Sequence, residues 1–291
     1  MNLVVGATGN LGGEICRLLR DQNKPVRAIV RERSDPERVG MLAAMGAETV
    51  EGDLTNRESL DAAVRGAATV LSTATQIARD ADLEGVDLEG QKGLVDAARE
   101  GGVDHFIYVS FTGSIDVSCP LERAKRTVET HLRESGLAYT ILRPSYFMEA
   151  WLGPVIGFDY ENARVRVYGD GTNPITFISL GDVAKFAVAC VDNLVARDRV
   201  LELGGPEAVS PLDAVRVFEE VTGRSFAVEH MPVEAIKGMR EGASSPLEES
   251  FATLMLCYAQ GDEIPMDETL REFPVRLASV RDYAERVAAP A

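Results

Sequence analysis

The stretch "VVGATGNLGG" at residues 4–13 decides the fold class of this 291-residue chain. A short apolar run ends at Gly6, and a helical pattern of apolar residues follows it. Three of the four glycines of this stretch, Gly6, Gly9 and Gly12, have the spacing of a dinucleotide-binding turn, in the strand–turn–helix context that makes such spacing informative. We expect Gly6 to permit the sharp turn, Gly9 to let the backbone approach a pyrophosphate, and Gly12 to allow close helix–strand packing. The alternative is an ordinary turn between a strand and a helix.

Short apolar runs alternate with helical patterns throughout the first half of the chain. This alternation is typical of parallel βαβ units, whose right-handed crossovers place helices on both faces of a sheet. The sequence therefore predicts an α/β fold with a doubly wound parallel sheet of the Rossmann-like type. Its expected strands are residues 3–5, 25–30, 68–74, 105–110 and 138–144, with a further short strand after Gly46.

The pattern changes after Pro144, where turn signals separate short β-like runs, and the chain becomes mostly helical from Pro206 onward. We expect a smaller, mostly helical C-terminal substrate lobe. The predicted division is an NAD(P)-binding domain of residues 1–144 plus 176–205, and a substrate-binding lobe of residues 145–175 plus 206–291.

Composition excludes several classes of function. The formal net charge of −16 argues against nucleic acid as a partner, since an acidic surface repels phosphates. No apolar run approaches the roughly 20 residues that span a bilayer, and the N-terminus lacks the basic start of a signal peptide. We therefore expect a cytoplasmic protein. The four cysteines are scattered and form no CxxC pair, so a metal site is not predicted and the thiols are expected to be reduced and mostly buried.

The end of the second strand indicates which dinucleotide binds. Arg31 stands where an acidic residue would accept hydrogen bonds from the ribose of NAD, and Arg33 is close to it. A guanidinium group suits the 2′-phosphate of NADP, so the sequence favours NADP(H). Glu32 leaves NAD(H) as the less favoured cofactor, and both arginines could instead be solvated surface residues.

Further cofactor contacts are expected along the same edge of the sheet. Asp53 could accept from the adenine amino group while Leu54 packs on the ring, and the small residues Thr73 and Ala74 would let the dinucleotide lie close to the backbone. Plain turn chemistry is the alternative for both pairs. The glycine turn itself supplies Gly6, Ala7, Thr8, Gly9, Asn10 and Leu11.

Six segments together resemble the NmrA-like family of atypical short-chain dehydrogenases/reductases, which is related to isoflavone reductase-like and quinone reductase-like proteins. They are "VVGATGNLGG", "VRAIVRERSD", "GDLTN", "FIYVSFTG", "KRTVETHLRESGLAYTILRPSYFMEAW" and "PITFISLGDVAKFAV". They run in family order over roughly the first 190 residues, and the C-terminal lobe matches more loosely. The resemblance implies that Lys125 lies near the nicotinamide ribose and that the segment 143–147, with Tyr146 and Phe147, passes close to the nicotinamide.

The usual acid of short-chain reductases is missing. These enzymes use a Tyr and a Lys spaced YxxxK on one helix face, together with a Ser. Here Lys125 is present, but Leu121 occupies the tyrosine position and cannot donate a proton. The remaining candidates are Lys125 itself, Tyr146, and Ser110 at a strand end. Lys125 could instead be a solvated lysine paired with Glu129, and Ser110 could be a cap.

Three functions stay open. The favoured one is an NADPH-dependent reductase of a small apolar carbonyl, quinone or enone acceptor. The resemblance also implies a non-catalytic NAD(P)(H)-sensing regulator or an assembly scaffold, since some members assist photosystem assembly. The third is a binding protein for a small apolar ligand. The aromatic segment 145–151 could line a pocket for such an acceptor, with packing of the lobe as the alternative. The helix 246–258 could form a lid, and a hydrophobic helix of the lobe or a dimer contact is the alternative for it. A homodimer contact and a regulatory protein partner also stay open.

Overall fold

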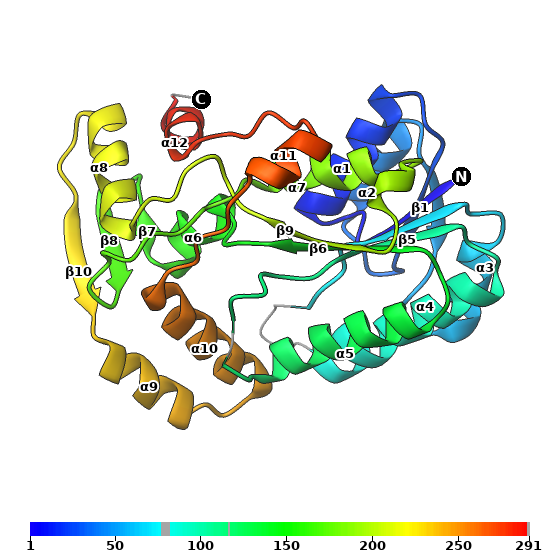
Figure 1. Cartoon of the computed structure of the whole chain (residues 1–291), viewed down its shortest axis with the longest axis horizontal. Helices are drawn as coiled ribbons and strands as arrows, with labels where there is room; N and C mark the ends of the chain where they lie inside the picture. The colour runs from blue at the N-terminus through cyan, green and yellow to red at the C-terminus, as the bar shows by residue number, and fades with distance from the viewer. Residues whose placement is uncertain (77–81, 116, 290–291) are drawn as a thin grey trace. The chain divides into compact units, whose positions relative to one another are not determined.

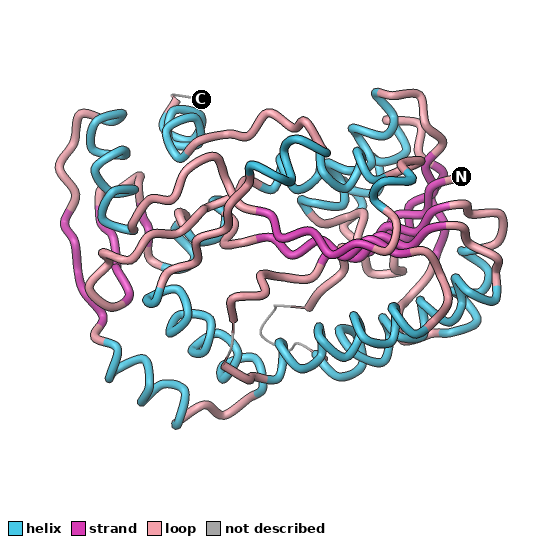
Figure 2. Tube along the Cα trace, viewed as in Figure 1, coloured by secondary structure: helices cyan, strands magenta, loops and turns pink. Residues whose placement is uncertain are grey.

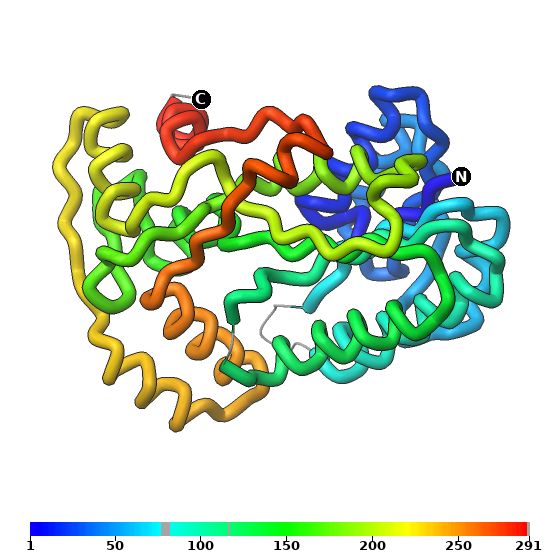
Figure 3. The backbone as a smooth tube through the Cα atoms, in the orientation of Figure 1, coloured from blue at the N-terminus to red at the C-terminus, as the bar shows by residue number. Residues whose placement is uncertain are grey.

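The computed structural model describes residues 1–76, 82–115 and 117–289. They form two compact units. Unit 1 comprises residues 1–111, 121–143 and 183–201, and unit 2 comprises residues 112–120, 144–182 and 202–291. Segments 112–120, 176–182 and 202–205 thus pack within unit 2, whereas the division predicted from sequence placed them in the first domain. Figure 3 traces how the chain returns to each unit.

A seven-stranded sheet forms the centre of unit 1, with strand order β3-β2-β1-β4-β5-β6-β9. The pairings from β3 to β6 are all parallel, which confirms the predicted doubly wound sheet. The order reverses between β1 and β4, and ligands of open α/β sheets bind at such a switch point. The strands are β1 (Asn2–Val5), β2 (Val26–Val30), β3 (Glu48–Glu51), β4 (Thr69–Ser72), β5 (His105–Val109), β6 (Tyr139–Pro144) and β9 (Arg199–Leu203).

Helices cover both faces of this sheet (Figures 1 and 2). On one side lie α1 (Asn10–Asp21), α2 (Pro36–Ala44) and α7 (Leu180–Cys190), and on the other lie α3 (Arg57–Val64), α4 (Gln91–Glu100) and α5 (Pro120–Glu134). Two short segments complete the unit, the π-helix η1 (Leu83–Gly90) and the 3₁₀ turn η3 (Leu194–Ala196). The sequence pattern predicted one helix over η1 and α4, so the π-helical turn is a difference from the expectation.

Apolar residues at alternate strand positions build the core between the sheet and α3, α4 and α5. Phe106 and Tyr108 of β5 are fully buried there, as expected from their shared strand face. Leu94, Val128 and Leu132 from α4 and α5 pack onto them. The helix starts follow local chemistry, since the side chain of Asn56 caps α3 by accepting from the Ser59 amide.

Unit 2 contains helices and a second sheet with strand order β10-β8-β7. The expectation of a mostly helical chain after Pro206 missed β10, whose five residues are largely exposed and so carry no apolar pattern. The strands are β7 (Phe158–Asp159), β8 (Arg164–Tyr168) and β10 (Ala227–Met231). The helices are α6 (Met148–Trp151), η2 (Pro154–Ile156), α8 (Pro211–Thr222), α9 (Val233–Glu241), α10 (Pro246–Gln260), α11 (Asp267–Glu272) and α12 (Val280–Ala288).

Three global features bear on the expectations from composition. Within the described ranges, no helix is both long and apolar enough to cross a membrane. No cluster of three or more His, Cys, Asp or Glu side chains in that same part of the chain could hold a metal ion. The four cysteines are buried, as expected from their small apolar character.

Candidate functional site: the glycine turn and the buried lysine of unit 1

The turn between β1 and α1 has the geometry that its glycines predict. Gly6 has a φ of +86°, a conformation that favours glycine. A Cβ at Gly6 would lie 2.7 Å from Thr73 Oγ1, and a Cβ at Gly12 would lie 2.2 Å from the carbonyl oxygen of Gly6. The turn is therefore packed too closely against its neighbours for any side chain at these two positions.

The N-terminus of α1 follows this turn and has no side-chain cap. Gly9 is the N-cap residue with extended backbone, and the first turn of the helix contains no acidic residue. The first backbone N–H groups of a helix have no intrahelical partner and carry the positive end of the helix dipole. The turn thus has the donors and the local polarity that suit a pyrophosphate. Its members Ala7, Thr8, Asn10 and Leu11 lie along the same segment.

Arg31 and Asp53 lie near one another at the ends of neighbouring strands. Arg31 follows β2 and Asp53 follows β3, and both belong to unit 1. Hydrogen bonds from the hydroxyl and amide of Thr55 lower the pKa of Asp53, and the positive charge of Arg31 adds to this effect. Asp53 therefore takes part in the turn chemistry that was its alternative role, and Leu54 beside it is half-buried. Arg31 and Arg33 are exposed.

Arg38 is a basic residue at this site that the sequence analysis missed. It lies in the first turns of α2, and its Nη1 donates to Asn10 Oδ1 at 2.9 Å. This bond brings the guanidinium group of Arg38 to the glycine turn.

The end of β4 closes the other side of the glycine turn. Thr73 donates to the carbonyl oxygen of Val5 from both its amide, at 3.0 Å, and its hydroxyl, at 3.2 Å. Gln91 of α4 fixes the same strand end, since its amide nitrogen donates to the carbonyl oxygen of Ala74 at 2.9 Å and its oxygen accepts from Ser72. Thr73 and Ala74 are thus held close to Gly6.

Lys125 is buried on α5 and pairs with Asp87 of η1. The lysine is 5% exposed and Asp87 is fully buried, with 3.6 Å between Nζ and Oδ1. The alternative of a solvated lysine paired with Glu129 is therefore wrong, because Glu129 is occupied by arginines. Burial lowers the pKa of Lys125, and the charge and hydrogen bond of Asp87 oppose that shift. A lysine whose pKa is lowered by burial suits proton transfer near neutral pH better than a solvated lysine does.

Tyr108 lies beneath Lys125 on β5. The lysine Nζ is 5.4 Å from the centroid of the Tyr108 ring, in the geometry of a cation–π contact. Among the described residues, the Tyr108 hydroxyl is a buried polar atom with no hydrogen-bond partner. Burial raises its pKa well above the ordinary value, and the nearby charge of Asp87 adds to this. Leu121, which occupies the tyrosine position one turn before Lys125, is also buried.

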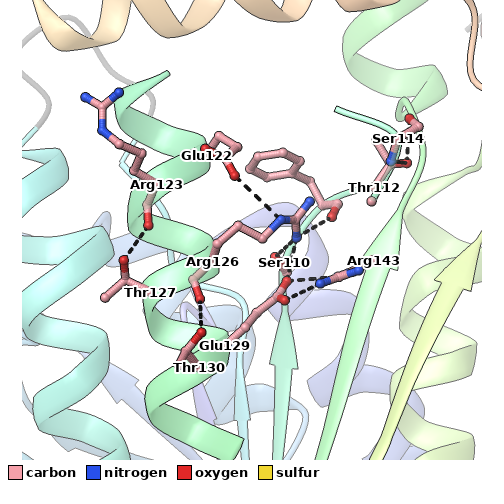
Figure 4. Close-up of polar contacts among 12 residues, drawn as sticks. Ser110, Thr112, Ser114, Glu122, Arg123, Arg126, Thr127, Glu129, Thr130 and Arg143 are labelled. Atoms are coloured by element: carbon pink, nitrogen blue, oxygen red, sulfur yellow. Dashed lines mark hydrogen bonds and ion pairs between the residues drawn. The ribbon is translucent and has the colours of Figure 1, made fainter. Parts of the chain in front are cut away.

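Ser110 belongs to a second polar cluster around Glu129 (Figure 4). Glu129 is fully buried and accepts from Arg126 at 2.6 Å and from Arg143 at 2.5 Å. Burial raises the pKa of Glu129, but hydrogen bonds from Arg143 and Ser110 outweigh it and hold the pKa below the ordinary value. Arg126 also stacks on the Phe111 ring at 5.0 Å. The Ser110 hydroxyl is thus engaged in an ionic network at the end of β5.

Tyr146 and Phe147 belong to unit 2. The Tyr146 ring makes edge contacts with Trp151 at 4.7 Å and with Tyr258 at 5.2 Å, and its hydroxyl donates to the carbonyl oxygen of Leu254 at 3.3 Å. Burial raises its pKa well above the ordinary value. Phe147 is half-buried and forms a parallel bridge with Ile178. Packing within the lobe, the alternative given for these aromatic residues, is what unit 2 shows.

Within unit 1 the structure gathers most of the predicted residues at the carboxyl ends of the strands. Gly6, Thr73 and Ala74 meet at the switch point, and Arg31 lies near Asp53 on the neighbouring strand ends. Lys125 is held by Asp87, which the sequence analysis did not single out. No spacing rule links a residue of η1 to a lysine on α5, so only the folded chain could reveal this pair.

Comparisons with known proteins find relatives that share sequence with most of this chain. The chain is 32% identical over 233 residues to the photosystem II assembly factor Ycf39 of Cyanophora paradoxa, covering 79% of this chain and 71% of that protein. It is 27% identical over 274 residues to an NAD(P)H azoreductase of Xenophilus azovorans, covering 91% and 92% of the two chains.

The fold has close counterparts among solved structures. The triphenylmethane reductase of Citrobacter sp., solved in complex with NADP(H), superposes with a TM-score of 0.81 at 21% identity, covering 99% of this chain and 100% of that chain. The sequence profile of the NmrA-like family matches residues 2–283. Because this match spans nearly the whole of unit 1 and unit 2, the chain belongs to the NmrA-like family.

Proposed function

We propose that this chain binds NADP(H) at the glycine turn of unit 1 and reduces a small apolar carbonyl, quinone or enone acceptor. The observation that carries the proposal is the burial of Lys125 beside Asp87, in the same unit as an uncapped helix start flanked by guanidinium groups. A surface scaffold has no need of a desolvated ammonium group, whereas a proton donor does. The azoreductase among the relatives supports a reductive chemistry.

Each part of the cofactor has candidate partners in unit 1. The N–H groups of the turn and of α1 would hold the pyrophosphate, and Thr73 and Ala74 would flank it. Arg31, with Arg33 and Arg38, would pair with the 2′-phosphate, which favours NADP(H) over NAD(H). Leu54 would pack on the adenine, with Asp53 accepting from its amino group. When bound, the nicotinamide supplies the hydride for the reduction.

Lys125 would be the proton donor. Its ammonium group would hydrogen-bond the ribose hydroxyls and give a proton to the acceptor oxygen as that oxygen gains negative charge. Asp87 would keep the amine in place through the ion pair that the two residues form. Ser110 is held by the Glu129 network, so it would help to orient the acceptor and would not donate the proton. Tyr146 is the second candidate donor, and its engaged hydroxyl and raised pKa place it behind Lys125.

The test is NADPH oxidation, followed at 340 nm, with a panel of quinones, enones and azo dyes. Lys125→Met removes the amine but keeps the length of the side chain, so it should abolish turnover while NADPH still binds. Lys92→Met is the matched control, since Lys92 lies on α4 and pairs with Glu89. Turnover by Lys125→Met at the wild-type rate would exclude the lysine, and Tyr146→Phe would be tested next.

The alternative function is an NAD(P)(H)-sensing regulator or assembly factor. Two observations favour it: the identity shared with Ycf39, and Leu121 in the position of the usual tyrosine. Stoichiometric NADPH binding without oxidation by any acceptor of the panel would support this alternative. Such a result would show that the cofactor site, which both functions need, is present without the reductase chemistry, which only the reductase needs.

A further inference from the structure

We propose that Asp87 is a positioning residue, which holds the amine of Lys125, in the first half of α5, and keeps it charged in its buried site. The inference rests on the proposed function where it concerns turnover, but it concerns a pair of residues that can be studied without turnover. Asp87 lies on the π-helix η1, and Lys125 lies on the helix that follows β5.

The carboxylate of Asp87 is itself held rigidly. Its Oδ1 accepts from the Thr75 hydroxyl at 2.5 Å, and its Oδ2 accepts from the Gln76 amide at 2.9 Å. Both donors lie just after β4, so the carboxylate is tied to the strand end beside the glycine turn. A carboxylate fixed by two donors and facing a lysine defines where the lysine amine can lie.

The packing of η1 explains the direction in which the Asp87 side chain points. The π-helical turn of η1 packs closely at Gly90. A Cβ at this position would lie 2.8 Å from the carbonyl oxygen of Gly85 and 2.8 Å from Leu54 Cβ. Asp82 caps the start of this segment by accepting from the Gly85 amide at 2.7 Å. Single π-helical turns often occur at functional sites, since they turn one side chain out of the regular helical register.

Among the described residues, few other groups can compensate the positive charge of Lys125. Burial lowers the pKa of Lys125; Asp87 and Glu129 oppose the shift, and Arg126 adds to it. Glu129 is already engaged by Arg126 and Arg143, and the Tyr108 ring contributes only its face. Among the residues that the structure describes, Asp87 is the carboxylate in contact with the amine. Its loss would leave a buried ammonium group without its main partner.

The experiment is a direct titration of the lysine by NMR in the cofactor-free protein. The chain has five lysines, so ¹³C labelling at lysine Cε gives a simple spectrum, and Lys125→Arg assigns the resonance of interest. In Asp87→Asn, which keeps the shape of the side chain, the Lys125 resonance should titrate at lower pH than in the wild-type protein. Asp96→Asn is the matched control, because Asp96 accepts from His131 at 3.0 Å and does not contact Lys125.

A second measurement uses turnover. The wild-type rate should fall as pH rises through the pKa of Lys125, because only the ammonium form carries the proton. Asp87→Asn should move this fall to lower pH, and Asp87→Glu, which restores the negative charge, should move it back. A role confined to folding would lower the amount of active protein without moving the pH profile.

The outcomes separate the two proposals. If the Lys125 resonance titrates in Asp87→Asn as it does in the wild-type protein, the assignment of Asp87 is overturned, whatever the rates show. If Asp87→Asn does not fold, Asp87→Ala, which also removes the negative charge, takes its place, and an unchanged Lys125 titration there overturns the assignment. If no acceptor is reduced, the proposed reductase function fails, and the titration still decides the role of Asp87.

Discussion

A Cβ on Gly12 would lie 2.2 Å from the carbonyl oxygen of Gly6, so the start of α1 and the turn after β1 are in direct backbone contact. Two glycines six residues apart therefore define one rigid turn. This contact brings the first N–H groups of α1 to the end of β1, at the point where the strand order reverses. The glycine pattern therefore indicates close backbone packing directly, and it indicates cofactor binding only through that packing.

Gly12→Ala should destabilise the folded chain by about 1–3 kcal/mol, because the added methyl group overlaps a backbone oxygen that cannot move independently. The same variant should bind NADPH more weakly, since the turn must open to accept the methyl group. Chemical denaturation gives the first quantity and isothermal titration gives the second.

Gly13→Ala is the control for that substitution. Its Cβ would lie 3.4 Å from the carbonyl oxygen of Ala7, an ordinary contact, and alanine is preferred to glycine within a helix by about 0.5–1 kcal/mol. Gly13→Ala should therefore leave stability unchanged or raise it. Equal losses in the two variants would mean that the close contact at Gly12 is not the cause.

The fold was predictable from sequence because its signals are local. The alternation of strands and helices in unit 1 and the turn at Gly6 depend on residues close together in the chain. Strand β10 was missed because its exposed residues leave no apolar pattern to detect. Pairs such as Asp87–Lys125 and Arg38–Asn10 join residues 28 or more positions apart, and no spacing rule predicts them. Sequence reasoning thus singled out individual residues such as Gly6 and Lys125, and it missed Asp87 and Arg38, which are identified by their partners in the folded chain.

Arg31→Ala should weaken binding of NADPH by about 10-fold or more and leave NADH almost unchanged, because a charge-assisted hydrogen bond contributes about 1.5–3 kcal/mol and only NADPH has the 2′-phosphate. Arg38→Ala should also weaken binding of NADPH more than binding of NADH. It also removes the hydrogen bond that holds the Asn10 side chain. Arg99→Ala, at an exposed arginine paired with Asp96 and Glu100, is the control. Equal losses for NADPH and NADH in Arg31→Ala would exclude a 2′-phosphate contact.

Glu129→Gln should cost about 3 kcal/mol of folding stability at neutral pH, because it leaves the arginines of the network without their buried carboxylate. The pKa of Glu129 is held below its ordinary value of 4.5, so its contribution is complete above that pH and is lost as pH falls through the lower, folded-state pKa. The stability difference between wild type and Glu129→Gln should therefore shrink in acid.

Urea denaturation of both proteins between pH 7 and pH 3 measures this difference. Glu134→Gln, at an exposed position of the same helix, should show no comparable difference at any pH. A stability gap between wild type and Glu129→Gln that stays constant down to pH 3 would mean that the charge of Glu129 does not stabilise the fold.

Tyr108→Phe should leave folding stability unchanged or raise it by about 1 kcal/mol, because it removes a buried hydroxyl that has no partner among the described residues. The ring beneath Lys125 is retained. Tyr168→Phe offers the opposite case, since the Tyr168 hydroxyl donates to the carbonyl oxygen of Ile156 at 2.7 Å, and its loss should cost about 1 kcal/mol. Denaturation of the two variants side by side tests whether the Tyr108 hydroxyl lacks a partner. A larger loss of folding stability in Tyr108→Phe than in Tyr168→Phe would mean that the Tyr108 hydroxyl is hydrogen-bonded in solution. Because the hydroxyl lies close enough to Asp87 for that charge to raise its pKa, such engagement would add Tyr108 to the groups that hold Lys125.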